Sequence, residues 1–483
     1  MNLQRLKSIC AVSFLTFCVV AHPSCSQQTE ENFTDSLAEV SSEELKEDDL
    51  EPYWFVPEEN ENKLFLDLEK VVNLAISQNL DILIASSRLR QSQGQLISSF
   101  ADLLPSIRFS SSIERFEGGE VFFGADPINL DRTTQRFGVF GDYAFQTGGK
   151  FFFQVASSKN RLNQAKEFRN RSFQLALRDS VISYFTWLND IARNEVAQQS
   201  LEESISQLSL TQARLKNGFA TQLELMQNST LKSENENLVL ETKNRELISS
   251  VNLAALLNVP VGNELVTNED FLKPITFLDQ DFSIEEAIRI AANNRPDLRE
   301  LKYAITESKY NFASAIADFF PTLSASGFVR QIGPDLNDLD NSEQGIISLD
   351  IDVLKNLGVG RIGNLKSTKA SISEAKLNHE KQLVEATKQI AKAYYDKNLF
   401  EDKLRVASDK LKSSAEAYRI ALARLKSSVG INLEVVQALT KYTEARLQYK
   451  TAAANFNSAQ IALLYEVGLL TPEQVVNNIY TNL

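Results

Sequence analysis

An internal repeat constrains the fold of this chain more than any other feature. Aligning Leu66 with Phe282 brings ADLLP at 101–105 onto ADFFP at 317–321 without a gap. Each half is about 200 residues, which is too long for one unit of a solenoid. The sequence therefore predicts a mainly α fold with a small β part, built from a duplicated supersecondary unit. Its parts are a first repeat over 63–260, a linker over 261–281, a second repeat over 282–470 and a C-terminal tail over 471–483.

Each repeat is predicted to open with a single helix. The helix would start near Asp67 or Ser283, since Asp and Ser side chains accept hydrogen bonds from the free N–H groups of a first turn. It would end at Pro105 or Pro321, because proline cannot continue a helix. These prolines are interpreted as ordinary helix stops at a helix-to-strand junction.

Long helices are predicted in the later part of each repeat. Proline and glycine are absent from 152 to 217, and apolar residues recur there at spacings of three and four. We expect a matching helix over 361–427, and shorter returning helices over 222–257 and 432–467. At 1.5 Å per residue each long helix would run on the order of 100 Å. Such a helix is unstable alone, so the first and returning helices are expected to lie end to end beside it.

Four segments between these helices alternate apolar and polar residues, which predicts strands with one apolar and one polar face. They lie near 107–114, 137–145, 322–329 and 347–353. Each repeat thus supplies a hairpin, either of an ordinary half-buried sheet or of a membrane barrel. In a bilayer an open sheet would leave its edge groups unpaired, so further copies of the chain would have to close it.

The N-terminus is typical of an export signal over residues 1–26. Arg5 and Lys7 precede an apolar stretch over 9–21 that is too short to span a membrane. Two interpretations of Cys25 stay open: it is removed with the signal, or it is lipidated as in an exported lipoprotein. The acidic residues 27–62 are predicted to be a disordered lead-in.

Composition excludes several classes of function. The formal net charge of −13 argues against a nucleic-acid partner, because phosphate binding needs a basic surface. Only two histidines occur, His22 and His379, and all three cysteines lie in the first 25 residues. A histidine-based triad and a thiolate metal site are therefore not expected, and the sequence predicts neither a cofactor nor an enzyme.

Three groups of motifs, in order and in both repeats, resemble the TolC-like outer-membrane efflux family. They are the repeat start FSIEEAI at 282–288 with NRPDL at 294–298, the junction ADFFPTL at 317–323, and Arg-Leu-Lys at 214–216 and 424–426 with Leu-Glu at 223–224 and 433–434. The resemblance covers about 63–470. It implies a homotrimer with a trimeric α-helical barrel in the periplasm and a 12-stranded transmembrane β-barrel, four strands per chain, in the outer membrane of a Gram-negative-type bacterium.

The same resemblance implies a passive exit duct of a tripartite efflux or type I secretion system, working with a periplasmic adaptor and an inner-membrane transporter. Its site residues would surround the periplasmic entrance, at the tips of the helical hairpins. Those predicted here are Arg214, Gly218, Glu224 and Gln227 in the first repeat, and Arg424, Gly430, Glu434 and Gln437 in the second.

Alternatives remain open for these residues and for the function. Glu224 and Glu434 would ring the entrance and attract cations, or would be first-turn residues stabilised by the helix dipole. Arg214 and Arg424 would pair with acids on neighbouring helices and hold a closed state, or would be solvated. Gly218 is expected to supply a positive φ at a helix end. The rival function is a periplasmic coiled-coil adaptor or scaffold.

Overall fold

The computed structural model describes residues 63–480, except for 119, 124–125, 130–131, 147, 261–263, 268–272, 278–282, 337, 352–357 and 428. The predicted signal over 1–26, with Cys25, and the predicted lead-in over 27–62 lie outside the described residues. The first repeat contains α3 (Leu68–Gln78), α4 (Leu80–Ala101), β2 (Ser106–Phe116), β5 (Arg132–Gln146), α5 (Lys150–Lys216) and α6 (Gln222–Leu256). The second contains α7 (Ile284–Asn294), α8 (Pro296–Ala317), β7 (Thr322–Gly333), β8 (Asp340–Asp350), α9 (Val359–Lys426) and α10 (Asn432–Val467). The same element order in both halves confirms the duplication.

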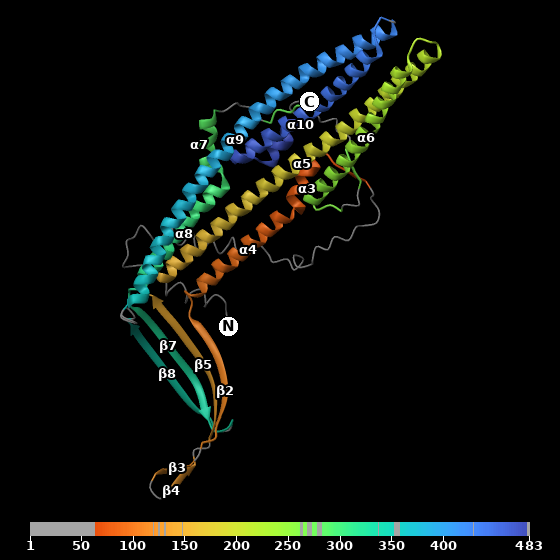
Figure 1. The fold of residues 1–483 in the computed structure, drawn as a ribbon. Helices are drawn as coiled ribbons and strands as arrows, with labels where there is room; N and C mark the ends of the chain where they lie inside the picture. The colour runs from red at the N-terminus through yellow and green to blue at the C-terminus, as the bar shows by residue number, and fades with distance from the viewer. Residues whose placement is uncertain are drawn as a thin grey trace. The chain divides into compact units, whose positions relative to one another are not determined.

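The long helices α5 and α9 contain 67 and 68 residues, so each is about 100 Å long. Both follow a glycine with a φ of 74°, Gly149 or Gly358. The helices α3 and α4 lie along the half of α5 nearer the sheet, and α6 lies along the rest (Figure 1). The helices α7, α8 and α10 cover α9 in the same way. The expected end-to-end arrangement beside each long helix is therefore confirmed, and α5 also packs against α8 and α10 of the other repeat.

The prediction of a single opening helix in each repeat is wrong. Asp67 and Ser283 do cap it, since their side chains accept from the N–H groups of Lys70 and Glu286. The helix then breaks at Asn79 in the first repeat and at Arg295 in the second. Both residues have extended backbone, and each serves as the last cap of one helix and the first cap of the next.

The helix ends also differ from the prediction. The second helix of each pair ends at Ala101 or Ala317, before Pro105 or Pro321 is reached. A tight turn follows, in which Leu104 N–H donates to the Ala101 carbonyl over 3.0 Å and Phe320 N–H donates to the Ala317 carbonyl over 3.1 Å. Each proline therefore follows a turn that has already stopped the helix, and directly precedes β2 or β7.

The four predicted strands form one antiparallel sheet of order β2-β5-β7-β8, which leaves β2 and β8 as its edges (Figure 1). The central pairing of β5 with β7 joins the two repeats. One face of the sheet is apolar and open to solvent. Its exposed large side chains include Ile107, Phe109, Ile113, Val139, Phe145, Val329, Ile347 and Leu349. The strands are longer than expected, and β8 begins at Asp340, ahead of the predicted 347.

Further elements were not predicted. A three-residue strand β1 (Lys63–Phe65) pairs in parallel with β6 (Glu264–Val266), which lies within the expected linker. A small hairpin of β3 (Glu120–Phe123) and β4 (Asp126–Asn129) lies between β2 and β5. The predicted tail contains helix α11 (Pro472–Tyr480). None of the described helices is long and apolar enough to cross a membrane.

The largest apolar core lies midway along α5, where the returning helices end. Tyr184, Phe185 and Trp187 of α5 pack there with Leu253 of α6 and Ile461 of α10. All of these side chains are at most 1% exposed. This core fixes the two helical hairpins at their bases and so determines where their free ends lie.

Candidate functional site

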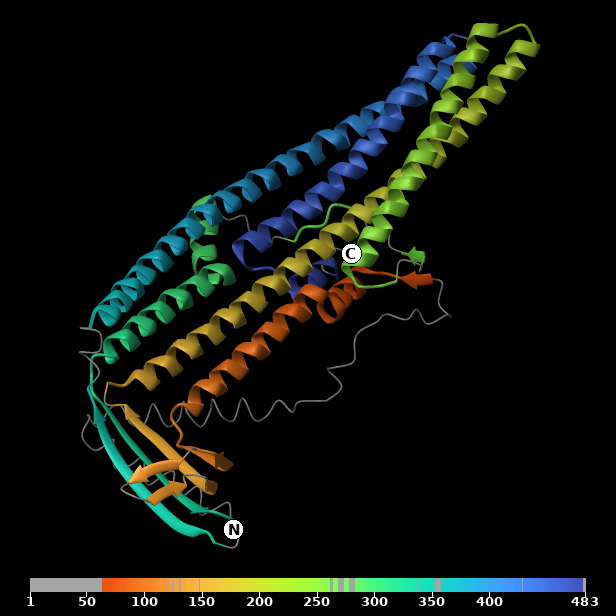
Figure 2. The same cartoon turned by 60° about the horizontal axis from the view of Figure 1, so that its bottom comes forward.

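The turns between α5 and α6 and between α9 and α10 form two hairpin tips at the same end of the helical bundle (Figure 2). They contain the predicted entrance residues. One hydrogen bond of Arg214 connects the two tips directly, from Nη1 to the carbonyl of Leu425 over 2.9 Å. A second stays within its own turn, from Nη2 to the carbonyl of Phe219 over 3.3 Å. Arg214 is therefore held by backbone carbonyls of both tips, whereas the sequence had left open an acid partner or a solvated side chain.

The two glycines at the tips have different roles. Gly218 has a φ of 78°, and the neighbouring Phe219 N–H donates to the Arg214 carbonyl over 2.8 Å. The expected positive φ is thus confirmed for Gly218. Gly430 is not among the positive-φ glycines. It lies against the end of α9 instead, where an added Cβ would come within 3.0 Å of the Arg424 Cβ and 3.1 Å of the Leu425 nitrogen.

Both predicted glutamates have local partners. Glu224 forms a capping box with Thr221, in which its N–H donates to Thr221 Oγ1 over 3.2 Å and its carboxylate accepts from the Thr221 N–H over 3.3 Å. Glu434, at the matching position of α10, forms an ion pair of 3.7 Å with Arg424. Both partners of that pair are about half exposed, so the contact contributes little energy. Gln227 is half-buried and Gln437 is exposed.

A buried polar cluster behind the tips was missed by the sequence reasoning. Asn432 Oδ1 of α10 accepts from Gln207 Nε2 of α5 over 3.1 Å and from Asn228 Nδ2 of α6 over 3.0 Å. Asn228 also donates to Thr211 Oγ1 over 2.9 Å. The four side chains are at most 4% exposed. We call Gln207, Thr211, Asn228 and Asn432 the tip cluster; it joins three helices from both repeats.

The tip cluster is the end of a longer polar seam between α5 and α6. Asn235 donates to the Ser200 carbonyl over 3.1 Å, and Thr242 hydrogen bonds to Asn194 Oδ1 over 3.4 Å. The α6 members of the seam are seven residues apart, namely Asn228, Asn235, Thr242 and Ser249. This heptad spacing of polar residues is the signal that could have revealed the seam.

A separate cluster, of charged side chains, lies where α7 and α8 meet. Arg295 is 1% exposed and forms ion pairs with Asp297 over 2.7 Å and with Glu466 over 2.8 Å. Burial acts to lower the pKa of Arg295, but the hydrogen bonds and charges of Asp297 and Glu466 raise it above its usual value. Burial acts to raise the pKa of Asp297, but the Arg295 hydrogen bond and the charges of Arg171 and Arg295 lower it. The cluster therefore stays ionised and holds the break between the helices.

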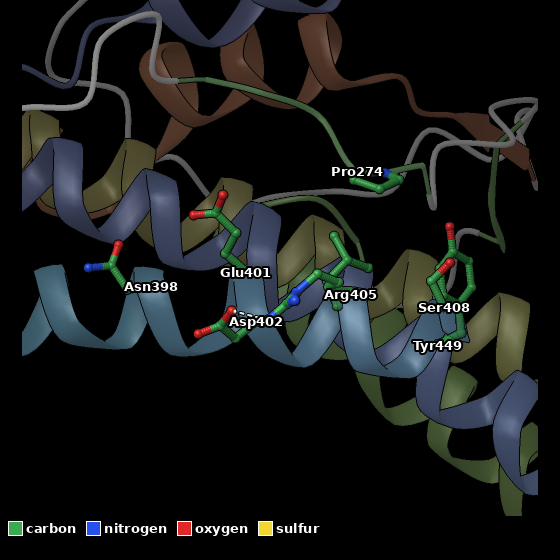
Figure 3. A pocket seen from close by; sticks show the side chains of 8 residues that line it. Pro274, Asn398, Glu401, Asp402, Arg405, Ser408 and Tyr449 are labelled. Atoms are coloured by element: carbon green, nitrogen blue, oxygen red, sulfur yellow. Dashed lines mark hydrogen bonds and ion pairs between the residues drawn. The ribbon is translucent and has the colours of Figure 1, made fainter. Parts of the chain in front are cut away.

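A surface hollow of about 510 Å³ lies on α9 and α10 beside Pro274 (Figure 3). Its charged side chains are paired within α9, with Asp402 bonded to Arg405 over 3.0 Å and Glu401 to Lys397 over 2.8 Å. Within the described ranges, no group of three or more His, Cys, Asp or Glu side chains is placed to hold a metal ion.

Comparisons with known proteins agree with this geometry. The probable efflux pump outer membrane protein TtgC of Pseudomonas putida is 24% identical over 391 residues, which span 77% of this chain and 76% of that protein. The outer membrane protein VceC of Vibrio cholerae has the same fold, with a TM-score of 0.71 at 18% identity over 83% of this chain and 96% of that one. The CmeC outer membrane channel of Campylobacter jejuni also matches, with a TM-score of 0.71 at 18% identity over 86% of this chain and 88% of that one.

The model of the outer membrane efflux protein family matches residues 71–259 and 287–468, which are the two repeats. These two matches together cover well over half of the 483 residues. This chain belongs to the outer membrane efflux protein family.

Proposed function

We propose that the chain is one subunit of a passive outer-membrane exit duct in a tripartite efflux system. The observation that carries this proposal is the duplicated unit, in which each family-matched repeat supplies two strands with an apolar exposed face and one long helical hairpin. The relative TtgC is described as an outer membrane protein of an efflux pump. Cargo would pass along the duct without chemical change.

The duct requires several copies of the chain. The four-stranded sheet has two edges, β2 and β8, and an open edge in a bilayer leaves backbone groups unpaired. Cyclic assembly removes both edges by pairing β8 of one copy with β2 of the next. Three copies form a barrel of twelve strands, an even number within the known range, above a tunnel of twelve helices. The apolar face of the sheet then contacts lipid and the polar face lines the lumen.

The hairpin tips suit a docking surface for a periplasmic adaptor. Large apolar side chains are exposed on both tips at matching positions, with Phe219 at 74% and Val429 at 73%, and Leu223 at 67% and Leu433 at 44%. Exposed apolar groups at one end of an elongated helical bundle mark a place for a protein partner. The adaptor would in turn connect the duct to an inner-membrane transporter.

The tips also form the entrance of the duct. Arg214 connects the tip of α5 to the end of α9 through the Leu425 carbonyl, so it holds the two hairpins together. Movement of one hairpin away from the other would break this hydrogen bond. Arg424 and Glu434 act within one hairpin and so contribute less to closure.

Single-channel recording on detergent-purified protein in planar bilayers tests whether the protein forms a duct and whether Arg214 holds its entrance closed. We expect a low conductance for the unmodified protein and a higher one for Arg214→Gln, because the tip-to-tip hydrogen bond is lost. A matched control is Arg405→Gln, which removes an exposed arginine of α9 outside the tips. A rival adaptor or scaffold would be extracted without detergent and would give no conductance, which would refute the duct.

A further inference from the structure

The polar face of the sheet carries phenylalanines and arginines where alternation alone would place small polar residues. The strand register puts Arg108 of β2 opposite Phe140 of β5, and Phe140 opposite Phe328 of β7. The two rings lie 5.6 Å apart between centroids and are tilted by 43°. Arg330 follows Phe328 by two residues and is on the same face. We call Arg108, Phe140, Phe328 and Arg330 the Arg–Phe belt.

Each arginine of the belt lies over one of the rings. The Cζ atom of Arg108 is 5.1 Å from the centroid of Phe140, and that of Arg330 is 4.6 Å from the centroid of Phe328. Both distances are within the range in which a guanidinium is attracted to an aromatic face. Contact with the rings restricts the positions of the two guanidinium groups before any ligand arrives.

Neither belt arginine has a carboxylate partner in the part of the chain that the structure describes, in contrast to Arg136 and Arg115. Arg136, on the same face, pairs with Glu114, and Arg115, on the apolar face, pairs with Glu117 over 2.8 Å. The Nε atom of Arg330 is buried and has no hydrogen-bond partner among the described residues. The belt therefore presents positive charge that the sheet itself leaves without a counter-ion.

The strand register places a glycine opposite Arg330, which leaves room for the arginine side chain. Gly138 of β5 pairs with Arg330, and a Cβ at Gly138 would come within 2.7 Å of the Arg330 Cβ. Any larger residue there would displace the arginine. The adjoining row toward the helices contains one acid, Asp142, opposite Ser106. The adjoining row on the other side contains Arg136 and Asp340, which both neighbour Ile332. The belt and its two adjoining rows thus hold three arginines and two aspartates, a net charge of +1.

We infer that the Arg–Phe belt is a contact site for planar anionic cargo in the lumen of the duct. This inference rests on the proposed function, which turns the polar face inward. A guanidinium that contacts a phenylalanine ring can still offer its planar face to an aromatic ring of the cargo and its N–H edge to a sulfonate or carboxylate. Three copies would repeat the belt around the barrel, and rings of arginine give a pore a preference for anions.

Equilibrium binding to the detergent-purified oligomer tests the site without requiring conduction. The probes are 1,5-naphthalenedisulfonate, which is planar, and 1,4-butanedisulfonate, which has the same charge without a ring. In calorimetric titrations we expect the aromatic dianion to bind about tenfold more tightly, a difference of about 1.4 kcal/mol, because only its ring can stack on the guanidinium groups. Arg108→Gln with Arg330→Gln should abolish binding of both probes.

Two further variants separate charge from stacking. Phe140→Leu with Phe328→Leu should remove the preference for the aromatic probe and keep weak binding of both dianions. Arg108→Lys with Arg330→Lys should do the same, because lysine retains charge and loses the planar face. The control is Arg115→Gln, on the opposite face, which should bind as the unmodified protein does. Gel migration of the intact oligomer checks that each variant is assembled.

The outcomes distinguish this inference from the proposed function. The belt is not a site for planar anions if the unmodified protein binds the two probes equally, or if binding is unchanged after loss of both belt arginines. Either result refutes the inference even if the protein conducts. Arginine-dependent binding together with no conductance in bilayers supports the anion site at the belt and contradicts the proposed duct function. Conductance that the aromatic dianion blocks in the unmodified protein, and fails to block in the arginine double variant, supports both.

Discussion

Arg295 shows how one side chain can decide a local break in a helix. The residue after it is proline, which is well placed at the first position of α8 and disfavours a helical conformation of the residue before it. The guanidinium then turns into the protein, where it bonds to Asp297, Glu466 and Gln389 from three helices. The proline after Arg295 was therefore a local signal of the helix break. What stabilises the break is the contact of Arg295 with side chains that the fold brings together.

Glu300, near the charged cluster around Arg295, has a raised pKa. Burial, together with the negative charges of Asp297 and Glu167, raises the pKa of Glu300 to about 7. The folded protein thus holds a proton that the carboxyl in the unfolded chain releases near its ordinary pKa of 4.5. Stability from this group is fully present at low pH and is lost as the pH rises through the window from about 4.5 to about 7.

Glu300→Gln is expected to stabilise the protein above this window and to have little effect below it. The gain at pH 8 should be about 1 kcal/mol, which is less than the full shift implies because the carboxyl is partly solvated. Thermal unfolding followed at pH 8 and at pH 5 measures the difference. A gain of the same size at both pH values would show that the pKa of Glu300 is not raised.

Glu224 and Glu434 give a prediction about ion selectivity. If they ring the entrance and attract cations, replacing both with Gln should lower the cation preference of single channels. Reversal potentials under a salt gradient measure this preference, and Glu416→Gln, which changes an exposed acid of α9, is the control. An unchanged preference would leave both glutamates as first-turn residues, one in its capping box and one paired with Arg424.

At the scale of elements, the two helical hairpins have different interiors despite their common origin. The α6 seam positions are Asn228, Asn235, Thr242 and Ser249, and the matching positions of α10 are Ala438, Ala445, Ala452 and Ala459. At these positions the first hairpin thus has side chains that can form hydrogen bonds, and the second has alanines. Hydrogen bonds between side chains depend on geometry more than apolar contacts do, so the first hairpin is the more sensitive to substitution.

Asn432→Ala tests the tip cluster. Gln207 and Asn228 would both lose the acceptor Oδ1 of Asn432, and Gln207 Nε2 has no other bond recorded in the described chain. We expect a loss of about 1–3 kcal/mol, the cost of a buried donor without a partner. Chemical denaturation of the solubilised protein measures it. Gln437→Ala, on the exposed side of the same helix, should change stability by less than about 0.5 kcal/mol. Equal losses of stability in the two variants would show that the hydrogen bonds of the tip cluster do not stabilise the protein.

At the scale of the whole molecule, the two edge strands predict how copies assemble. Within one chain β5 and β7 separate β2 from β8, so the edges are about 14 Å apart. A disulfide requires Cα atoms within about 7 Å. A cysteine in β2 can therefore bond to a cysteine in β8 only between copies. The natural cysteines all lie in the first 25 residues, which leaves the sheet free for this test.

We expect Ser110→Cys, combined in turn with a cysteine at Ser342, Gln344, Ile346 or Ser348, to give at least one pair that links copies under oxidation. Denaturing gels should then show dimers and trimers, and no larger species, because a three-membered ring closes on itself. The control pairs Ser110→Cys with Ser326→Cys in the central strand β7. Linkage by the control, or ladders beyond the trimer, would refute the closed arrangement.

Local pattern was enough to determine the repeat, the long and returning helices and the four strands. The turn that ends each long helix placed α10 at Asn432–Val467, and period-two alternation located each strand of the sheet. It also found the positive φ of Gly218, since glycine after a helix end often adopts one. These features are set by residues close together in the chain, so they can be read from sequence.

Only the tertiary structure decided which distant residues meet. The pairing of β5 with β7, the bond from Arg214 to the Leu425 carbonyl and the tip cluster all join residues from different repeats. The Arg–Phe belt likewise needed the register of three strands. Periodicity reports which face of an element is buried and is silent about what covers it. Such contacts depend on how the two repeats pack, which no local window of sequence contains.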